Sequence, residues 1–150
     1  MTVRTPDAAT VCAMVVRQRS ATRRLPALLN FTIYADSEAN LREARRAASN
    51  GYVGVEGLTR GKMCSPDKPI PYEHDGSDAA ALIDWIARQP WSDGRVGMYG
   101  GSYEGFTQWA AAKQMPKALK TIIPSVAVAP GIDVPMDGNL FLNFIYPWPF

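Results

Sequence analysis

A serine at the junction of a strand pattern and a helix pattern is the residue in this sequence best suited to chemistry. Ser102 lies in the segment 95–106, whose letters are RVGMYGGSYEGF. The first half of this segment is typical of a short buried strand, and the second half begins a helix. A serine on a sharp strand-to-helix turn holds its hydroxyl clear of the sheet, where the hydroxyl can attack a substrate carbonyl. Ser102 is therefore a candidate catalytic nucleophile.

The glycines around Ser102 fit the general nucleophile pattern G-x-S-x-G only in part. Gly100 stands two residues before the serine, but Glu104 occupies the place of the second glycine and Gly105 comes one residue later. A helix N-cap serine after a glycine turn is the alternative, because N-cap serines accept hydrogen bonds from the first helical turn. The segment on its own leaves both interpretations open.

A serine nucleophile needs a general base, and no histidine stands where the pattern predicts one. In hydrolases with this turn the triad follows the chain order Ser, Asp or Glu, His. The single histidine, His74, precedes Ser102 and lies in the approach to a helix. We interpret His74 as a surface loop residue, so the 150 residues contain no histidine placed to act as the base. The isolated chain is then expected to be inactive as an enzyme.

The composition indicates one globular domain and excludes several classes of protein. Hydrophobic residues make up 47% of the 150 positions and charged residues 20%, with a net charge of +2, which is ordinary for a globular domain. No basic stripe indicates a nucleic-acid partner. No apolar run reaches the ~18 residues of a membrane span, and the N-terminus lacks the apolar segment of a signal peptide. We therefore expect a cytoplasmic protein without a nucleic-acid or membrane partner; an N-terminal extension outside this sequence would be the route to a secreted one.

Metal and cofactor motifs are lacking as well. Cys12 and Cys64 show no C-x-x-C or Cys/His spacing, so neither a metal site nor a disulfide framework is expected. The pair Gly61–Lys62 lacks the other residues of a P-loop, and the glycines of segment 97–101 do not fit G-x-G-x-x-G. A nucleotide-binding module is thus the weaker alternative, and no cofactor is predicted.

The apolar patterning predicts alternating strands and helices around these residues. Strands are expected at 11–16, 27–34, 52–58, 94–100 and 120–123, and helices from Asp36 or Ser37 to Asn50, from Ser77 to Pro90 and from Ser102 to Met115. Such alternation implies a mostly parallel sheet with helices on both faces. In these sheets the site lies at the carboxyl ends of the strands, where Tyr34, the Arg60–Gly61 loop and Ser102 all fall.

The segment 59–75 is a long loop that contains three prolines. Loops of that length without a helix or strand are usually functional in a compact domain. We expect Arg60 to fix this loop by ion pairing, and Trp85 and Trp91 to contribute to packing.

Several runs of the sequence together resemble a known family. They are Gly51-Tyr52-Val53, Thr59-Arg60-Gly61, Ile83-Asp84-Trp85-Ile86, Gln89-Pro90-Trp91, Asp93-Gly94-Arg95-Val96-Gly97-Met98 and Gly100-Gly101-Ser102-Tyr103-Glu104-Gly105. Over most of residues 25–130 the chain resembles the cocaine-esterase/X-Pro-dipeptidyl-peptidase-like α/β-hydrolases. The nucleophile turn of that family is G-x-S-Y-x-G, so Gly105 stands where the family has its glycine. The run 102–107 is most similar to the α-amino-acid ester hydrolase branch.

The resemblance implies a fold. That fold is α/β, and residues 1–150 would form the N-terminal part of one α/β-hydrolase domain, a three-layer sandwich of a mostly parallel sheet between helices. The catalytic acid and histidine, the remaining strands, a helical cap and a C-terminal β-domain would follow beyond Phe150. The last ten residues, 141–150, include five aromatics, which is unusual for a natural terminus and agrees with a continuation.

The resemblance also implies an oxyanion hole, the group of donors that stabilises negative charge on the reacting carbonyl oxygen. The backbone N–H of Tyr103 would be one donor and the phenol of Tyr34 the other. A buried strand tyrosine is the alternative for Tyr34. Glu104 either interacts with the helix dipole or accepts a substrate ammonium group, and Asp133 and Asp137 could share that second role.

The predicted activity is hydrolysis of a small-molecule ester or a peptide amide, by acyl transfer through an acyl-enzyme on Ser102. An X-Pro dipeptidyl-peptidase on the same machinery is one alternative, and an inactive fragment that only binds is the other. The acyl group, the leaving group and the oligomeric state stay open at the level of the sequence.

Overall fold

The computed structural model describes residues 1–137 and 140–142, apart from the side chains of Met136, Asp137 and Phe141. Along the chain the elements are β1 (Thr2–Arg4), β2 (Thr10–Val16), β3 (Leu25–Thr32), α1 (Ser37–Ser49), β4 (Val53–Leu58), α2 (Asp75–Ala87), β5 (Ser92–Gly101), α3 (Tyr103–Lys113), β6 (Leu119–Ser125), β7 (Met136–Asp137) and β8 (Leu140–Phe141). Most of the aromatic segment from which we expected a continuation, residues 143–150, lies outside the described residues.

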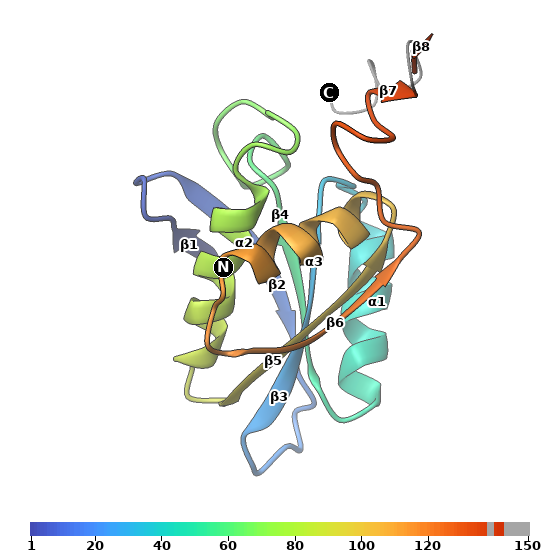
Figure 1. The fold of residues 1–150 in the computed structure, drawn as a ribbon. Coiled ribbons are helices and arrows are strands. Elements are labelled where there is room, and N and C mark those ends of the chain that lie inside the picture. The colour runs from blue at the N-terminus through green and yellow to red at the C-terminus, as the bar shows by residue number, and fades with distance from the viewer. Residues whose placement is uncertain (138–139, 143–150) are drawn as a thin grey trace.

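Strands β1 to β6 form one sheet in the order β1-β2-β4-β3-β5-β6 (Figure 1). Strands β4, β3, β5 and β6 run parallel to one another. The opening hairpin of β1 and β2 adds two antiparallel strands at the β4 edge. The mostly parallel sheet predicted from the alternation of strands and helices is therefore confirmed.

Helices cover both faces of this sheet. Successive residues of a strand point to opposite faces, so the two glycines of β4 show which helix lies on which face. On β4, a Cβ added to Gly54 would overlap the backbone of Ala44 in α1, whereas a Cβ added to Gly57 would lie 2.5 Å from Leu82 Cδ2 in α2. Helix α1 thus packs on one face, and α2 packs with α3 on the other (Figure 1). The sheet and its two helical layers form the three-layer sandwich that the family resemblance implies.

The main core lies between the sheet and α2. Its fully buried members are Val11, Leu29, Phe31, Val55, Ala79, Leu82, Ile83, Ile86, Val96, Met98 and Ala111. The four members from α2 are the residues whose helical spacing predicts a sheet-facing stripe. Burying a large apolar side chain stabilises a fold by about 1.5–3 kcal/mol, so this core firmly holds β3 and β5, the strands whose ends carry the site.

The connections change direction between β3 and β5. From β3 the chain crosses one face through α1 to reach β4, and from β5 it crosses the opposite face through α3 to reach β6. The segments that leave the carboxyl ends of these neighbouring strands therefore diverge, and ligands of parallel α/β sheets bind at such a point. Tyr34 follows β3 and Ser102 follows β5, so the fold brings both residues there.

Cys12 and Cys64 form a disulfide bond, so the expectation that the chain has none was wrong. The pairing depends on the fold, because β2 runs antiparallel to β4 and sets Cys12 opposite Leu58, the last residue of β4. The Cys12 N–H donates to Ser65 Oγ at 2.9 Å, and that hydroxyl donates to the Leu58 carbonyl at 2.9 Å. These bonds fix the start of the segment 59–75, which is called the proline-rich loop below.

Helix α2 begins at Asp75, two residues before the predicted cap. The Ser77 hydroxyl donates to the His74 carbonyl at 2.9 Å instead of capping, and His74 occupies the N-cap position without a side-chain cap bond. The physical reason is Asp75, whose carboxylate accepts the Tyr72 N–H at 2.9 Å and so ends the loop earlier. By contrast, Asp36 caps α1 as predicted.

Candidate active site

Ser102 lies on the turn between β5 and α3, with backbone angles φ 55° and ψ −119°. A positive φ is uncommon for a residue with a side chain and costs of order 1–3 kcal/mol, so it persists only where the surroundings enforce it. Ser102 occupies the N-cap position of α3, but its hydroxyl makes no capping hydrogen bond and the residue is exposed. The capping alternative was therefore wrong, and the turn presents the hydroxyl to solvent.

Backbone hydrogen bonds and a close helix approach enforce this turn. The Ser102 N–H donates to the Ser125 carbonyl at 3.0 Å, and the Ser102 carbonyl accepts the Gly105 N–H at 3.0 Å. A Cβ on Gly105 would lie 2.7 Å from Ala127 Cβ and 3.1 Å from the Ser125 carbonyl oxygen. Helix α3 can thus pass the end of β6 this closely only with glycine at position 105, which explains the departure from G-x-S-x-G.

Tyr34 follows β3, and its phenol donates a hydrogen bond to Ser102 Oγ at 3.3 Å. Its backbone is held on both sides, since its N–H donates to Thr32 Oγ1 at 2.9 Å and its carbonyl accepts Asn40 Nδ2 at 3.3 Å. Tyr34 is 43% exposed, so the buried-tyrosine alternative was wrong. The Tyr34 phenol is thus a held donor within hydrogen-bond reach of the candidate nucleophile.

Tyr103 directly follows Ser102 and is the first residue of α3. Backbone N–H groups in a first helical turn point toward the incoming chain, and the helix dipole adds positive potential there. In folds with this turn, the N–H after the nucleophile is one oxyanion donor. The Tyr103 side chain points the other way: the residue is 1% exposed, and its phenol donates to Asp75 Oδ2 at 2.8 Å.

The three acidic candidates for binding a substrate ammonium group lie in different places. Glu104 bends back under the turn, where its Oε2 accepts the Gly101 N–H at 3.4 Å. Asp133 Oδ1 accepts the Ala129 N–H at 2.7 Å and so closes its own loop. Asp137 lies in β7, and its side chain is outside the described residues.

A buried polar cluster, formed by Asn30, Glu56 and Tyr99, lies across β3, β4 and β5. Asn30 and Glu56 are paired in register on adjacent strands, and they are 4% and 2% exposed. The Tyr99 phenol donates to Glu56 Oε1 at 3.4 Å. Within the described residues, Glu56 Oε2 and Asn30 Oδ1 have no hydrogen-bond partner.

The surroundings of Glu56 favour its neutral form. Burial raises the pKa of Glu56 to about 9, and the nearby charges of Glu104 and Glu43 act in the same direction. The carboxyl is therefore protonated at neutral pH. Sequence reasoning missed this group, although a glutamate inside the apolar pattern of 52–58 was a signal that could have found it.

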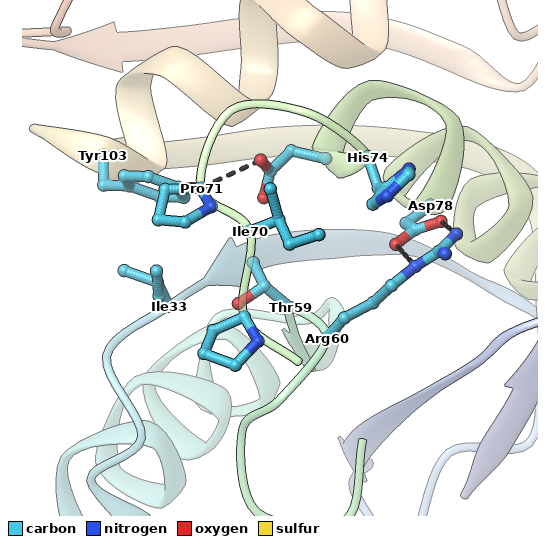
Figure 2. A pocket seen from close by; sticks show the side chains of 10 residues that line it. Ile33, Thr59, Arg60, Ile70, Pro71, His74, Asp78 and Tyr103 are labelled. Carbon is cyan, nitrogen blue, oxygen red and sulfur yellow. Dashed lines mark hydrogen bonds and ion pairs between the residues drawn. The ribbon is translucent and has the colours of Figure 1, made fainter. Parts of the chain in front are cut away.

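An ion pair fixes the proline-rich loop beside the site (Figure 2). Arg60 Nε lies 2.8 Å from Asp78 Oδ2, and Arg60 Nη2 lies 2.7 Å from Asp78 Oδ1. Asp7 adds a contact to Arg60 Nη1 at 2.8 Å. Asp78 is 1% exposed, and charge-assisted bidentate pairs of this kind are among the stronger protein hydrogen bonds. The prediction that Arg60 fixes its loop by ion pairing is confirmed.

The pocket in Figure 2 lies between this loop, α2 and Tyr103. Its volume is about 10 Å³, near the smallest space that holds one water, so it is too small for an organic substrate. His74 lines the pocket, and its Nε2 lies 3.5 Å from Glu73 Oε1. In the described part of the chain, no hydrogen bond joins His74 to Ser102, and no group of three or more His, Cys, Asp and Glu side chains could hold a metal ion.

The chain matches the X-Pro dipeptidyl-peptidase (S15) family over residues 7–149. It belongs to this family. The S15-family chain is 45% identical over 80 residues to the cocaine esterase of Rhodococcus sp. (strain MB1 Bresler), an alignment that covers 53% of this chain and 14% of the esterase. It is 30% identical over 122 residues to a putative serine esterase of Mycobacterium bovis, covering 67% of this chain and 19% of that protein. The chain thus spans less than a fifth of these relatives.

A solved structure of an α-amino acid ester hydrolase is similar to this S15-family chain, with a TM-score of 0.72 and 26% identity. That likeness covers 88% of this chain and 25% of the other. The family resemblance and the α/β-hydrolase fold predicted from the sequence are both confirmed.

Proposed function

We propose that the protein is a serine hydrolase that transfers acyl groups through an acyl-enzyme on Ser102. The observation that carries this proposal is the hydrogen bond from the Tyr34 phenol to Ser102 Oγ. It joins a hydroxyl nucleophile and a held donor at the carboxyl edge of the sheet, where parallel sheets bind ligands. The positive φ of Ser102 supports the same role, because such a conformation is costly and is concentrated at functional sites.

In the first half of the reaction, Ser102 Oγ attacks the substrate carbonyl carbon and its proton passes to a histidine. The carbonyl π bond breaks, and the negative charge on oxygen is stabilised by the Tyr34 phenol and the Tyr103 N–H. The double bond then re-forms and expels the leaving group, which takes the proton from the histidine. In the second half, water attacks the acyl-enzyme with the histidine as base, and Ser102 leaves with its proton restored.

We assign the histidine and the triad acid to a longer protein, called the parent protein below. In it, residues 1–150 form the N-terminal part of one α/β-hydrolase domain, with further strands, a cap and a C-terminal β-domain in the remainder. The chain order of the triad supports this assignment, as does the length of the relatives, of which alignments with this chain cover 14% and 19%. The isolated 150 residues would then show negligible turnover.

The substrate we propose is a small ester. The 45% identity to a cocaine esterase supports an ester, while membership of the X-Pro dipeptidyl-peptidase family supports removal of X-Pro dipeptides as the second candidate. Both substrates place an acyl carbonyl at Ser102. For a substrate with a free ammonium group, Asp137 is our first candidate acceptor and Glu104 the second, since Glu104 already binds the Gly101 N–H.

The disulfide bears on the compartment. Among residues 1–137 and 140–142, no helix is both long and apolar enough to cross a membrane. Disulfides persist mainly in oxidising compartments, so the bond between Cys12 and Cys64 supports an exported parent protein in place of the cytoplasmic location predicted from the sequence.

Steady-state kinetics of the parent protein test the proposal. The wild type should hydrolyse a small aryl ester, and Ser102→Ala should lower kcat by at least about 10⁴-fold. Ser49→Ala, which removes a hydroxyl at the far end of α1, is the matched control and should leave kcat unchanged. Relative kcat/KM on the ester and on an X-Pro amide then separates the two candidates. Ester hydrolysis that survives Ser102→Ala, or no turnover of either substrate class, would contradict the proposal.

A further inference from the structure

The side chain of Tyr103 ties the nucleophile turn to the start of α2. Its phenol donates to Asp75 Oδ2 at 2.8 Å. The Tyr72 N–H points at the same place, 2.9 Å from Asp75 Oδ2 and 3.1 Å from the Tyr103 phenol oxygen. Figure 2 shows Tyr103 reaching from the turn toward Pro71 at the end of the proline-rich loop. Three elements, the loop, α2 and α3, therefore meet at one carboxylate oxygen.

An aromatic cluster surrounds these hydrogen bonds. The ring of Tyr72 lies 5.0 Å from that of Tyr103 and 5.1 Å from that of Phe106, and the rings of Tyr103 and Phe106 are 5.6 Å apart. Such separations are typical of favourable aromatic pairs. Tyr72 also has a φ of 71°, which a residue with a side chain keeps only where its surroundings fix it. The Tyr103 ring thus packs against two aromatic rings that also contact each other.

Because Asp75 is buried, the loss of one of its hydrogen bonds costs more free energy than it would at the surface. Asp75 is 4% exposed and Tyr103 1% exposed, so bulk solvent does not reach either partner. A buried donor or acceptor that loses its partner carries the full cost of desolvation. Burial raises the pKa of Asp75 to about 6, while the hydrogen bond from Tyr103 acts against that rise. The Asp75 acceptor therefore fixes where the Tyr103 phenol can lie.

We propose that Asp75 is a positioning residue that fixes the Tyr103 peptide N–H at the oxyanion hole through the Tyr103 phenol. The inference rests on the proposed function. The peptide between Ser102 and Tyr103 cannot rotate without moving a ring that Tyr72, Phe106 and Asp75 enclose. Because oxyanion donors act only within a few tenths of an ångström of their proper place, an anchor on the far side of the same residue controls the donor.

The test compares kcat and KM on the ester in the parent protein. Tyr103→Phe removes only the phenol oxygen, and Asp75→Ala removes its acceptor. A donor misplaced by about 1 Å costs up to roughly 10²-fold, so each variant should lower kcat about 10- to 100-fold with KM little changed. Tyr52→Phe, which removes the hydroxyl of an exposed tyrosine, is the matched control and should match the wild type. Asp75→Asn keeps an acceptor and should recover most of kcat.

The double variant separates positioning from ordinary stability. If Asp75 acts through Tyr103, combining Tyr103→Phe with Asp75→Ala should lower kcat no further than the slower single variant does. Losses that multiply in the double variant would overturn the inference. So would single variants that unfold more easily yet keep wild-type kcat once the folded concentration is measured. Should Asp75→Ala not fold, Tyr103→Phe decides alone, and an unchanged kcat in it overturns the inference.

Failure of the inference and failure of the proposed function look different. If Ser102→Ala retains ester hydrolysis, the proposed function fails and the inference with it. If Ser102→Ala abolishes hydrolysis while Tyr103→Phe keeps wild-type kcat, Ser102 stays the nucleophile and only the role of Asp75 is wrong.

Discussion

The phenol of Tyr34 and the hydroxyl of Ser102 lie 3.3 Å apart although 68 positions separate the two residues in the chain. The contact exists because β3 and β5 are neighbours in the sheet while the chain between them forms α1, β4 and α2. Each residue leaves the carboxyl end of its strand, and the helices that follow depart on opposite faces. The contact between the proposed nucleophile and its proposed donor thus follows from the sheet order.

The first prediction removes that donor. Tyr34→Phe in the parent protein keeps the ring but not the hydroxyl. Loss of one oxyanion donor typically costs about 2.7–4 kcal/mol in the transition state, or about 10²–10³ in kcat, and KM should change little because the donor acts mainly on the transition state. Steady-state kinetics on the ester checks this, with Tyr52→Phe as control. An unchanged kcat would remove Tyr34 from the site and leave Ser102 in it.

The second prediction concerns Glu56. Its pKa is raised from the ordinary 4.5 to about 9 by burial and by the charges of Glu104 and Glu43. The folded state therefore binds the proton more tightly than the unfolded state, and stability should fall as pH rises from about 4.5 to about 9. Glu56→Gln carries no such proton, so the variant should gain stability relative to the wild type as pH rises through this window.

Urea unfolding of the parent protein at about pH 5, 7 and 9 measures this difference. Glu73→Gln, at a more exposed carboxylate whose side chain is 59% exposed, serves as control and should follow the wild-type profile. A Glu56→Gln variant that is uniformly less stable than the wild type, with no dependence on pH, would show that Glu56 is ionised when folded.

The third prediction concerns the disulfide. The bond between Cys12 and Cys64 closes a long loop, with a sequence separation of 52, and removing a crosslink of that span costs about 4 kcal/mol in the chain-entropy account. Replacing both cysteines by alanine should therefore lower the unfolding free energy by about that amount. A reductant should destabilise the wild type similarly and leave the double variant unaffected. Alkylation of both cysteines in unreduced, denatured protein would contradict the bond.

The fourth prediction tests the packing of the turn. A Cβ on Gly105 would meet Ala127 at 2.7 Å, while one on Gly101 would meet nothing closer than 3.4 Å. Gly105→Ala should cost about 1–3 kcal/mol of stability through overpacking and should also lower kcat, because α3 must move away from Ser102. Gly101→Ala is the matched control for stability and should cost clearly less. Equal costs in thermal unfolding would mean that the close approach does not set the glycine position.

The sequence carried the local information well. Apolar periodicity predicts α1, α2 and α3 and each parallel strand, because these elements bury one stripe or both faces. The strand-to-helix turn at Ser102 was predicted from the sequence because the glycines beside it mark a place where the chain has no room for side chains. Tyr34 was reached only through the family resemblance, as nothing local marks a tyrosine after a strand as a donor.

What the sequence concealed depends on contacts between distant elements. The partner of Cys12 follows from β2 running beside β4, which no spacing rule contains. The raised pKa of Glu56 needs burial on β4, between β2 and β3, together with charges from α1 and α3. Asp75 looked like the end of a loop, and only the packed structure shows that its carboxylate accepts the phenol of Tyr103. Each case combines at least two segments far apart in the chain.

Covalent labelling of the parent protein tests the central claim most directly. A fluorophosphonate forms a bond to an activated serine oxygen and expels fluoride, so it should modify Ser102 at one equivalent and abolish ester hydrolysis in proportion. Peptide mass mapping should find the adduct on the fragment that contains Ser102, and Ser102→Ala should not be labelled. Modification of a different residue, or full ester hydrolysis in protein whose Ser102 is completely labelled, would contradict the account.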